Sequence, residues 1–187
     1  PEGAGFRTDN ELTRAAHFAG GRMCVPDVRL GETYSVELWF WNGMPPEARP
    51  VAGYLFSHGP DGAPNCPGDH LGIGGTAGEP GKLLFYNGDE RREALYGATT
   101  ITTKTWNHVV LVRDGKRVVV YLNGNPSAEI ASESDVTRPS GGAAVFLGGR
   151  SDRFGTWEGK LAEVALYARA LTAQEAAAHY AAAEVLA

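Results

Sequence analysis

The chain has 187 residues, of which 43% are hydrophobic and 21% are charged, and its formal net charge is −5. This length and composition fit one globular domain that can bury a sizeable core. The negative charge, with no basic run longer than two residues, argues against nucleic acid as a partner. We also expect no membrane insertion, because no apolar run approaches the roughly 20 residues that a spanning helix needs.

The whole chain, residues 1–187, is expected to be a single domain with its core at about residues 15–182. No internal repeat or low-complexity linker divides it. The sequence opens with Pro1 and Glu2 rather than with a methionine and a basic-then-apolar export segment. We therefore expect a fragment of a longer protein, with neighbouring domains of the parent chain among its partners.

The first half of the chain carries strand patterns. Residues 34–41 alternate large apolar and polar side chains, as in a strand with one buried face. Further strands are predicted at 51–57, 71–74 and 82–86, separated by connections rich in glycine and proline. Asn87, followed by glycine, predicts a tight turn because both residues tolerate a positive φ.

The second half predicts a hairpin, two more strands and one helix. Residues 106–113 and 116–122 flank an Asp-Gly turn, and residues 144–148 and 159–167 read as later strands. Many strands with almost no helix between them predict an antiparallel sandwich or barrel. Thr172, with Glu175 three residues later, predicts a capping box at the start of a C-terminal helix.

The chain contains two cysteines, Cys24 and Cys66, too few for a multi-cysteine metal site. In an exported protein they could form one disulfide. Equally, both thiols could stay unbonded, and the sequence favours neither alternative.

Several blocks together form a pattern that covers about residues 15–182. These blocks are residues 17–21, 34–40, 106–115, 120–124, 147–149 and 159–175. They resemble the laminin-G-like domains of the concanavalin A-like lectin/glucanase superfamily. The resemblance implies an all-β, two-sheet antiparallel β-sandwich of the jelly-roll type, here with one short C-terminal α-helix. It also implies a module of an extracellular, periplasmic or cell-envelope protein that binds glycans or surface proteins.

The sequence shows no catalytic constellation. Retaining glycoside hydrolases need two carboxylates about 5 Å apart, which relatives place in Glu-x-Asp-x-x-Glu on one strand. The nearest string, residues 133–138, ends in an arginine within a polar stretch. A Gly-x-Ser-x-Gly nucleophile elbow is also absent from the sequence. We therefore expect no enzymatic activity, and a glycoside hydrolase is the least favoured alternative.

The histidines differ in their sequence context. His108 lies in a predicted strand and is expected to be a buried, hydrogen-bonded structural residue. His179 lies on the predicted helix and is expected to face solvent. His58 and His70 flank a loop rich in glycine, proline and aspartate, and they are the two histidines that suggest a functional role.

Calcium is the one cofactor that the resemblance suggests, because many relatives hold a structural calcium ion. Calcium needs six to eight oxygen ligands, and two positions where relatives often carry a carboxylate are Ala162 and Asn123 here. The candidate ligands are therefore loop residues, Asp61, Asn65 and Asp69. The alternative for these residues is ordinary turn chemistry, in which aspartate and asparagine hydrogen-bond their own backbone.

Loops that carry aromatic and polar side chains form the candidate ligand surface. An aromatic ring stacks on the apolar face of a sugar, while amides, carboxylates and guanidinium groups hydrogen-bond its hydroxyls. The candidate residues are Trp41, Asn42, Tyr86, Asn87, Asp89, Arg150, Asp152 and Trp157. Trp39 and Trp106 are expected in the core, and Trp41 is the tryptophan expected to be most exposed. Trp157 has an alternative role as a cap on the sandwich.

These observations predict a non-catalytic binding module that recognises carbohydrate or mediates adhesion. The first alternative is a protein–protein interaction or scaffold domain that positions a neighbouring enzymatic domain. An exposed apolar patch without an aromatic patch on the sandwich would favour that alternative.

Overall fold

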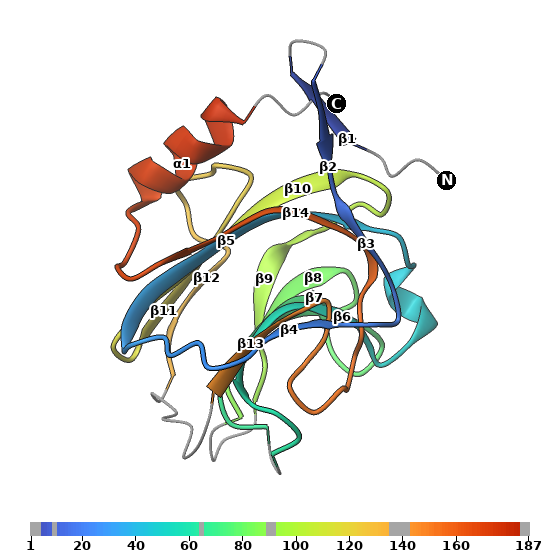
Figure 1. The fold of residues 1–187 in the computed structure, drawn as a ribbon, viewed down its shortest axis with the longest axis vertical. Helices are drawn as coiled ribbons and strands as arrows, with labels where there is room; N and C mark the ends of the chain where they lie inside the picture. Colours follow the sequence, from blue (N-terminus) through green and yellow to red (C-terminus); the bar gives the residue numbers. More distant parts are fainter. Residues whose placement is uncertain (1–4, 9–10, 64–65, 89–92, 135–142, 184–187) are drawn as a thin grey trace.

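The computed structural model describes residues 5–8, 11–63, 66–88, 93–134 and 143–183. Two antiparallel sheets of six strands each lie face to face (Figure 1). In spatial order, sheet I contains β12 (Ile130–Glu133), β11 (Arg117–Leu122), β10 (Trp106–Asp114), β5 (Thr33–Asn42), β14 (Glu158–Tyr167) and β3 (Ala16–Ala19). Sheet II contains β4 (Met23–Val25), β13 (Ala143–Leu147), β6 (Val51–Pro60), β7 (Asp69–Gly74), β8 (Lys82–Tyr86) and β9 (Leu95–Thr100).

The described residues also form a two-stranded sheet of β1 (Gly5–Thr8) and β2 (Glu11–Arg14), a 3-10 turn at Pro46–Ala48, and α1 (Ala173–Ala182). The architecture confirms the predicted two-sheet antiparallel sandwich with one short C-terminal helix. Within the described residues, no helix has the length and apolar character needed to cross a membrane.

The core lies between the two sheets because strand side chains alternate between opposite faces. From sheet I, β5 contributes Val36, Leu38 and Phe40, all buried in the main apolar cluster. From sheet II, Leu71 and Phe85 join the same cluster. The period-2 pattern of residues 34–41 thus assigns the correct residues to the core, and the intervening residues of β5 face outward.

Helix α1 covers part of the outer face of sheet I (Figure 1). Leu171 and Ala176 pack there against Val110, Val112 and Tyr121. The predicted capping box is present: the Glu175 backbone N–H donates to Thr172 Oγ1 at 3.2 Å, and the Thr172 backbone N–H donates to Glu175 Oε2 at 2.8 Å. These bonds satisfy backbone donors that the first turn of a helix leaves without partners.

The outer face of sheet I corrects two predictions. Trp39 is buried as expected, in a small apolar cluster beneath α1 where its ring stacks on that of Tyr180 at 5.5 Å. Trp106 was also expected in the core, yet it is only half-buried beside Trp39 on the same face. His179 was expected to face solvent, yet its Nδ1 lies 2.8 Å from Glu37 Oε2. These residues form an anchor for the helix.

Glu37 is the centre of that anchor. Its two carboxylate oxygens bond the buried His108 at 2.8 Å, His179 at 2.8 Å and the Tyr167 hydroxyl at 2.9 Å. Although burial works against the charge of Glu37, these hydrogen bonds lower its pKa from 4.5 to about 2. The prediction of a buried, hydrogen-bonded structural His108 is therefore confirmed.

Candidate functional site

The outer face of sheet II carries the candidate site. Leu71 and Phe85 face the core, so the adjacent His70 and Tyr86 face away from it. The loop from β13 to β14, residues 148–157, folds back over this face. The backbone N–H of Tyr54 donates to the carbonyl of Gly155 in this loop at 2.8 Å.

Two features hold this loop close to the sheet. Gly155 has a φ of 60°, and a Cβ at this position would lie 3.0 Å from the Tyr54 ring, so glycine permits both the turn and the close approach. Arg22, which precedes β4, donates from Nη1 to the carbonyl oxygens of Arg150 and Ser151 at 2.9 and 2.7 Å. The loop is thereby held by the approach of Gly155 to Tyr54 and by the hydrogen bonds from Arg22.

Arg150 organises the surface of the loop. Its guanidinium carbon lies 5.2 Å from the ring centroid of Tyr54, 5.3 Å from that of Tyr86 and 4.7 Å from that of Phe154. A planar, weakly hydrated guanidinium suits such stacking on aromatic rings. We call Tyr54, Tyr86, Arg150, Asp152 and Phe154 the aromatic–arginine cluster.

Asp152 closes the charged edge of the cluster. Arg150 donates from Nε to Asp152 Oδ1 at 2.9 Å and from Nη2 to Oδ2 at 2.8 Å, which is a bidentate ion pair. Burial works against both charges, but their mutual hydrogen bonds raise the pKa of Arg150 and lower the pKa of Asp152. Both groups are therefore charged at neutral pH.

The cluster combines exposed aromatic surface with polar edges. Phe154 is 45% exposed, Tyr86 is half-buried and Tyr54 lies beneath them. The Arg150 and Asp152 side chains are 15% and 29% exposed. A ligand can therefore meet an aromatic ring and polar atoms at one place on the outer face of sheet II.

A buried polar network supports the loop from below. Ser57 Oγ lies 2.5 Å from His70 Nδ1, and the backbone N–H of Ser151 donates to the same Ser57 Oγ at 3.0 Å. His70 Nε2 lies 3.0 Å from the carbonyl oxygen of Cys66, and Cys66 Sγ lies 3.0 Å from Ser151 Oγ. Burial lowers the pKa of His70 to about 4, so its imidazole is neutral at pH 7. His70 and His58 are buried, so the structure gives His70 a supporting position beneath the cluster and His58 no place on the ligand surface.

Both cysteines are free thiols in the structure, Cys24 exposed and Cys66 buried. Cys24 lies on the edge strand β4, whereas the Cys66 sulfur contacts Ser151. Of the two alternatives that the sequence left open, the structure therefore shows the unbonded one.

The structure brings together three of the predicted ligand residues, Tyr86, Arg150 and Asp152. It also adds Tyr54 and Phe154, which sequence reasoning did not single out. Phe154 lies within residues 150–157, and an aromatic residue flanked by arginine and glycine in a polar loop was an available signal. Tyr54 offered no comparable signal, because its strand reads as a mostly apolar run.

Three other predicted ligand residues are buried, which corrects those predictions. Trp157 is 0% exposed, because its ring fills the core beside Phe40. Asn42 is buried, and its Oδ1 accepts from the backbone of the turn after β5. Asn87 is buried and donates to Asp69 Oδ1 at 2.6 Å.

The remaining two predictions lie elsewhere. Trp41 is half-buried on the outer face of sheet I, with Lys160 Nζ 4.8 Å from its ring centroid, so it is on the opposite side of the sandwich from the cluster. Its role in ligand binding stays a prediction. Asp89 lies outside the described residues.

The two predicted calcium ligands that the structure describes, Asp61 and Asp69, each pair with an arginine. Asp69 is buried between the sheets, where both carboxylate oxygens bond Arg113 and also accept from Tyr34 and Asn87. Asp61 is exposed and pairs with Arg22 Nη2 at 2.6 Å, while Asn65 lies outside the described residues. Across the described ranges, no group of three histidine, cysteine, aspartate or glutamate side chains is placed to hold a metal ion. Asp69 binds a protein cation, which corrects its assignment as a calcium ligand, and calcium binding by the chain stays a prediction.

Comparison with known proteins gives one family and several similar folds. A laminin-G family model, described as the Concanavalin A-like lectin/glucanases superfamily, matches residues 19–177. Domain 4 of AbnA, a GH43 extracellular arabinanase from Geobacillus stearothermophilus solved with arabinotriose, superposes with a TM-score of 0.67 at 21% identity, covering 91% of this chain and 78% of that one.

Two further solved structures illustrate the range of this fold. The CBM40 module of the Ruminococcus gnavus IT-sialidase, bound to α2,3-sialyllactose, has a TM-score of 0.62 at 16% identity, with 81% of this chain and 84% of that one covered. A heptameric pentraxin from Limulus polyphemus has a TM-score of 0.56 at 21% identity, covering 78% and 68%. At these identities the likeness shows the fold alone. No curated protein sequence matches the chain.

Proposed function

Because this chain belongs to the Concanavalin A-like lectin/glucanases superfamily, we propose that it is a non-catalytic carbohydrate-binding module. The observation that carries the proposal is the aromatic–arginine cluster, with the exposed ring of Phe154 beside the ion-paired Arg150 and Asp152. The sugar complexes of the arabinanase domain and the sialidase module support it. Both are modules with this fold that were solved with a saccharide.

The chemistry of the cluster suits a sugar. The C–H face of a sugar ring is apolar and packs on an aromatic ring, whereas its hydroxyls need donors and acceptors. Of the five N–H donors of a guanidinium, Arg150 uses two for Asp152 and one for the Tyr54 hydroxyl at 3.2 Å. The Arg150–Asp152 edge can therefore exchange hydrogen bonds with hydroxyl groups without giving up its ion pair.

The charge state of the cluster argues against Asp152 as the general acid of a glycoside hydrolase. A general acid in glycoside hydrolysis needs a carboxyl group with a raised pKa. The pKa of Asp152 is instead lowered, since Arg150 stabilises its ionised form. We place the module in an extracellular or cell-envelope protein, where it would hold neighbouring domains of the parent chain near a glycan.

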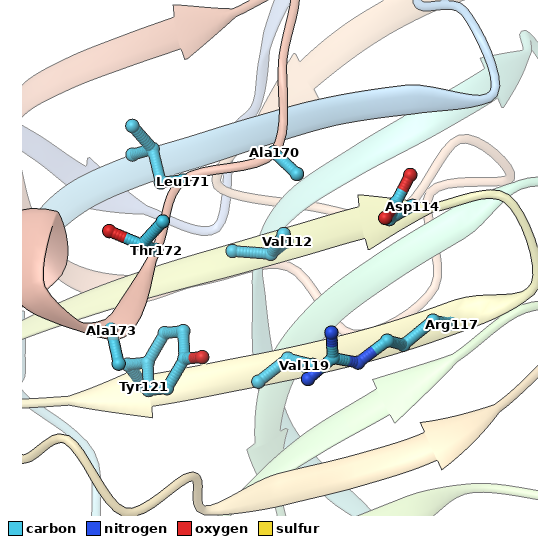
Figure 2. A pocket seen from close by; sticks show the side chains of 9 residues that line it. All are labelled: Val112, Asp114, Arg117, Val119, Tyr121, Ala170, Leu171, Thr172 and Ala173. Atoms are coloured by element: carbon cyan, nitrogen blue, oxygen red, sulfur yellow. The ribbon is translucent and has the colours of Figure 1, made fainter.

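The protein–protein alternative is favoured by a groove of about 360 Å³ on the outer face of sheet I. Figure 2 shows its lining: β10 and β11 contribute Val112 and Tyr121, and the segment leading into α1 contributes Leu171. These side chains are already buried by the contacts between helix and sheet. The groove therefore offers little apolar surface to a partner, and carbohydrate binding is the better supported function.

A glycan-array screen of the 187-residue chain, followed by calorimetry with the best ligand, tests the proposal. Phe154→Ala should weaken binding about tenfold, equivalent to about 1.4 kcal/mol. Leu166→Ala removes an exposed apolar side chain from sheet I and should leave the dissociation constant unchanged.

Two outcomes would contradict the proposal. If protein shown to be folded by circular dichroism binds no glycan on the array, the proposed carbohydrate function is wrong. Loss of binding in Trp41→Ala with full retention in Phe154→Ala would move the site to sheet I.

A further inference from the structure

We infer that the aromatic–arginine cluster selects a neutral sugar and rejects sugars that carry a carboxylate. This inference rests on the proposed function and specifies its ligand class. It follows from how the charges at the cluster are already paired.

The first reason is that the carboxylate-binding edge of Arg150 is already occupied. Arginine recognises a carboxylate by presenting two parallel N–H groups to its two oxygens. In Arg150 these groups are Nε–H and Nη2–H, and Asp152 accepts both at 2.9 and 2.8 Å. An acidic sugar would have to displace Asp152, which the loop also holds through the backbone N–H of Phe154 at 3.1 Å.

The second reason is that aromatic rings lie against the guanidinium. The rings of Tyr54, Tyr86 and Phe154 all have centroids within 5.3 Å of its central carbon. The rings limit access to the guanidinium from its faces. A carboxylate that approached the unused N–H groups of Arg150 would come close to Asp152 and be repelled by it. A neutral hydroxyl carries no such penalty and can accept from an unused N–H of Arg150.

The third reason is that the other arginine beside the loop is arranged in the same way. The guanidinium carbon of Arg22 lies 4.2 Å from the ring centroid of Phe146, and its Nη2 pairs with Asp61 at 2.6 Å. Two arginines at this face thus each have a ring, a carboxylate partner and largely buried side chains, since Arg22 is 12% exposed. Their arrangement fixes the loop in place and leaves little positive charge for an anionic ligand. Arg153, exposed on the same loop, is the cation that an acidic sugar would meet first.

The test compares a neutral ligand with a carboxylate-bearing ligand in each of two pairs. Lactose is compared with α2,3-sialyllactose, and neutral galactan fragments with polygalacturonan fragments, by calorimetry at two salt concentrations. We expect the neutral member of the pair that binds to be at least tenfold tighter. The preference should persist at high salt, because it comes from an occupied hydrogen-bonding edge rather than from long-range attraction.

The Asp152→Asn variant provides a more specific test of the inference. This change keeps the shape of the side chain but removes its negative charge, so residues 150 and 152 together become positive. The ratio of acidic to neutral affinity should therefore rise about tenfold. Glu163→Gln removes the same charge from an exposed position on sheet I and should leave the ratio unchanged. An unchanged melting curve and an unchanged circular dichroism spectrum in Asp152→Asn would show that the loop is intact.

The outcomes separate the two claims. If wild-type protein binds the acidic member more tightly, the inference about ligand class is wrong and the carbohydrate function stands. This holds whether or not Arg153→Gln abolishes that binding. An unchanged ratio in Asp152→Asn also overturns the inference. If neither member of any pair binds to folded protein, the proposed function fails, and the inference fails with it.

Discussion

The outer faces of the two sheets both contain a carboxylate held by cationic or hydrogen-bonding groups beside aromatic rings, yet they are covered differently. On sheet I, Glu37 lies beneath α1, and Trp39 is shielded by Tyr180. On sheet II, Asp152 belongs to a loop that leaves Phe154 exposed. Similar chemistry therefore stabilises a helix on one face and is available to a ligand on the other.

The difference follows from what lies over each sheet. A helix buries a larger area of the sheet beneath it than a short loop does. Helix α1 and the segment before it bring Leu171 and Ala176 against the valines of β10 and β11. The loop at 148–157 attaches to sheet II mainly through backbone hydrogen bonds and stacked arginines. We expect changes on sheet I to affect stability first and changes on sheet II to affect binding first.

The largest expected effect is that of Trp39→Ala. Removing a buried tryptophan deletes its contacts with Tyr180 and His108 and leaves a cavity, so we expect a loss of about 4 kcal/mol in the free energy of unfolding. Trp41→Ala, two residues along the same face but half-exposed, should cost about 1 kcal/mol. Urea denaturation of both variants measures the difference. Equal losses would show that α1 does not shield Trp39 in solution.

As the pH falls, the free energy of unfolding should decrease first because of His70 in sheet II. Burial lowers the pKa of His70 from 6.5 to about 4, so between these values the unfolded chain binds a proton that the folded chain rejects. Stability is therefore full above about pH 6.5 and falls by about 3 kcal/mol as the pH decreases toward 4. Chemical denaturation from pH 7.5 to 4 measures the slope. A flat profile across this window would mean that His70 is charged or solvated in the folded state.

Sheet I should respond at lower pH. The pKa of Glu37 is lowered from 4.5 to about 2, so its contribution is present above about pH 4.5 and is lost as the pH falls toward 2. Allowing for partial solvation, we expect about 2 kcal/mol from this group. Glu37→Gln should reduce the acid dependence below pH 4.5 and leave the dependence between 6.5 and 4.5 unchanged. Asp69, Asp152 and Glu175, whose pKa values are also lowered, contribute to the acid dependence that remains.

A smaller effect is expected at the start of α1. Thr172→Ala removes the hydroxyl that accepts from the Glu175 backbone N–H, and losing such a cap costs about 1 kcal/mol. Helix α1 should fray before the sandwich unfolds, which amide hydrogen exchange would detect as faster exchange in residues 173–182. Thr172→Ser keeps the hydroxyl and should restore protection. Unchanged exchange in the alanine variant would assign the stability of α1 to its packing alone.

The success of the capping-box prediction shows which features a sequence can report. Capping and strand alternation are local, so Thr172 and the pattern of residues 34–41 correctly predict α1 and the core face of β5. Strand β9 was missed because its sequence carries little apolar alternation and a glycine. Its edge is instead closed by Glu129, which accepts from the backbone N–H groups of Ala98 and Thr99 at 2.9 Å, and no local pattern encodes that contact.

Burial in the candidate site depends on distant residues in the same way. Trp157 could enter the core because two glycines far from each other in the sequence make room for it. A Cβ at Gly53 or at Gly159 would lie 2.9 Å from its ring. Arg150 and Asp152 were predictable as a pair because they lie two residues apart in one polar loop. Their position over Tyr54 depends on the fold of sheet II and could not be read from the sequence.

The smallest stability effect, and the most informative comparison, involves one exposed aromatic residue from each face. Phe154→Ala removes a stacking contact with Arg150 worth about 0.5 kcal/mol at an exposed site. Tyr180→Ala removes a ring of similar exposure that shields Trp39, and it should cost about 1.5 kcal/mol. Thermal unfolding of the two variants measures the difference. We expect a small loss at Phe154, because an exposed ring that contributes little to folding is available to a ligand. A loss of stability at Phe154 as large as that at Tyr180 would instead make Phe154 a structural residue.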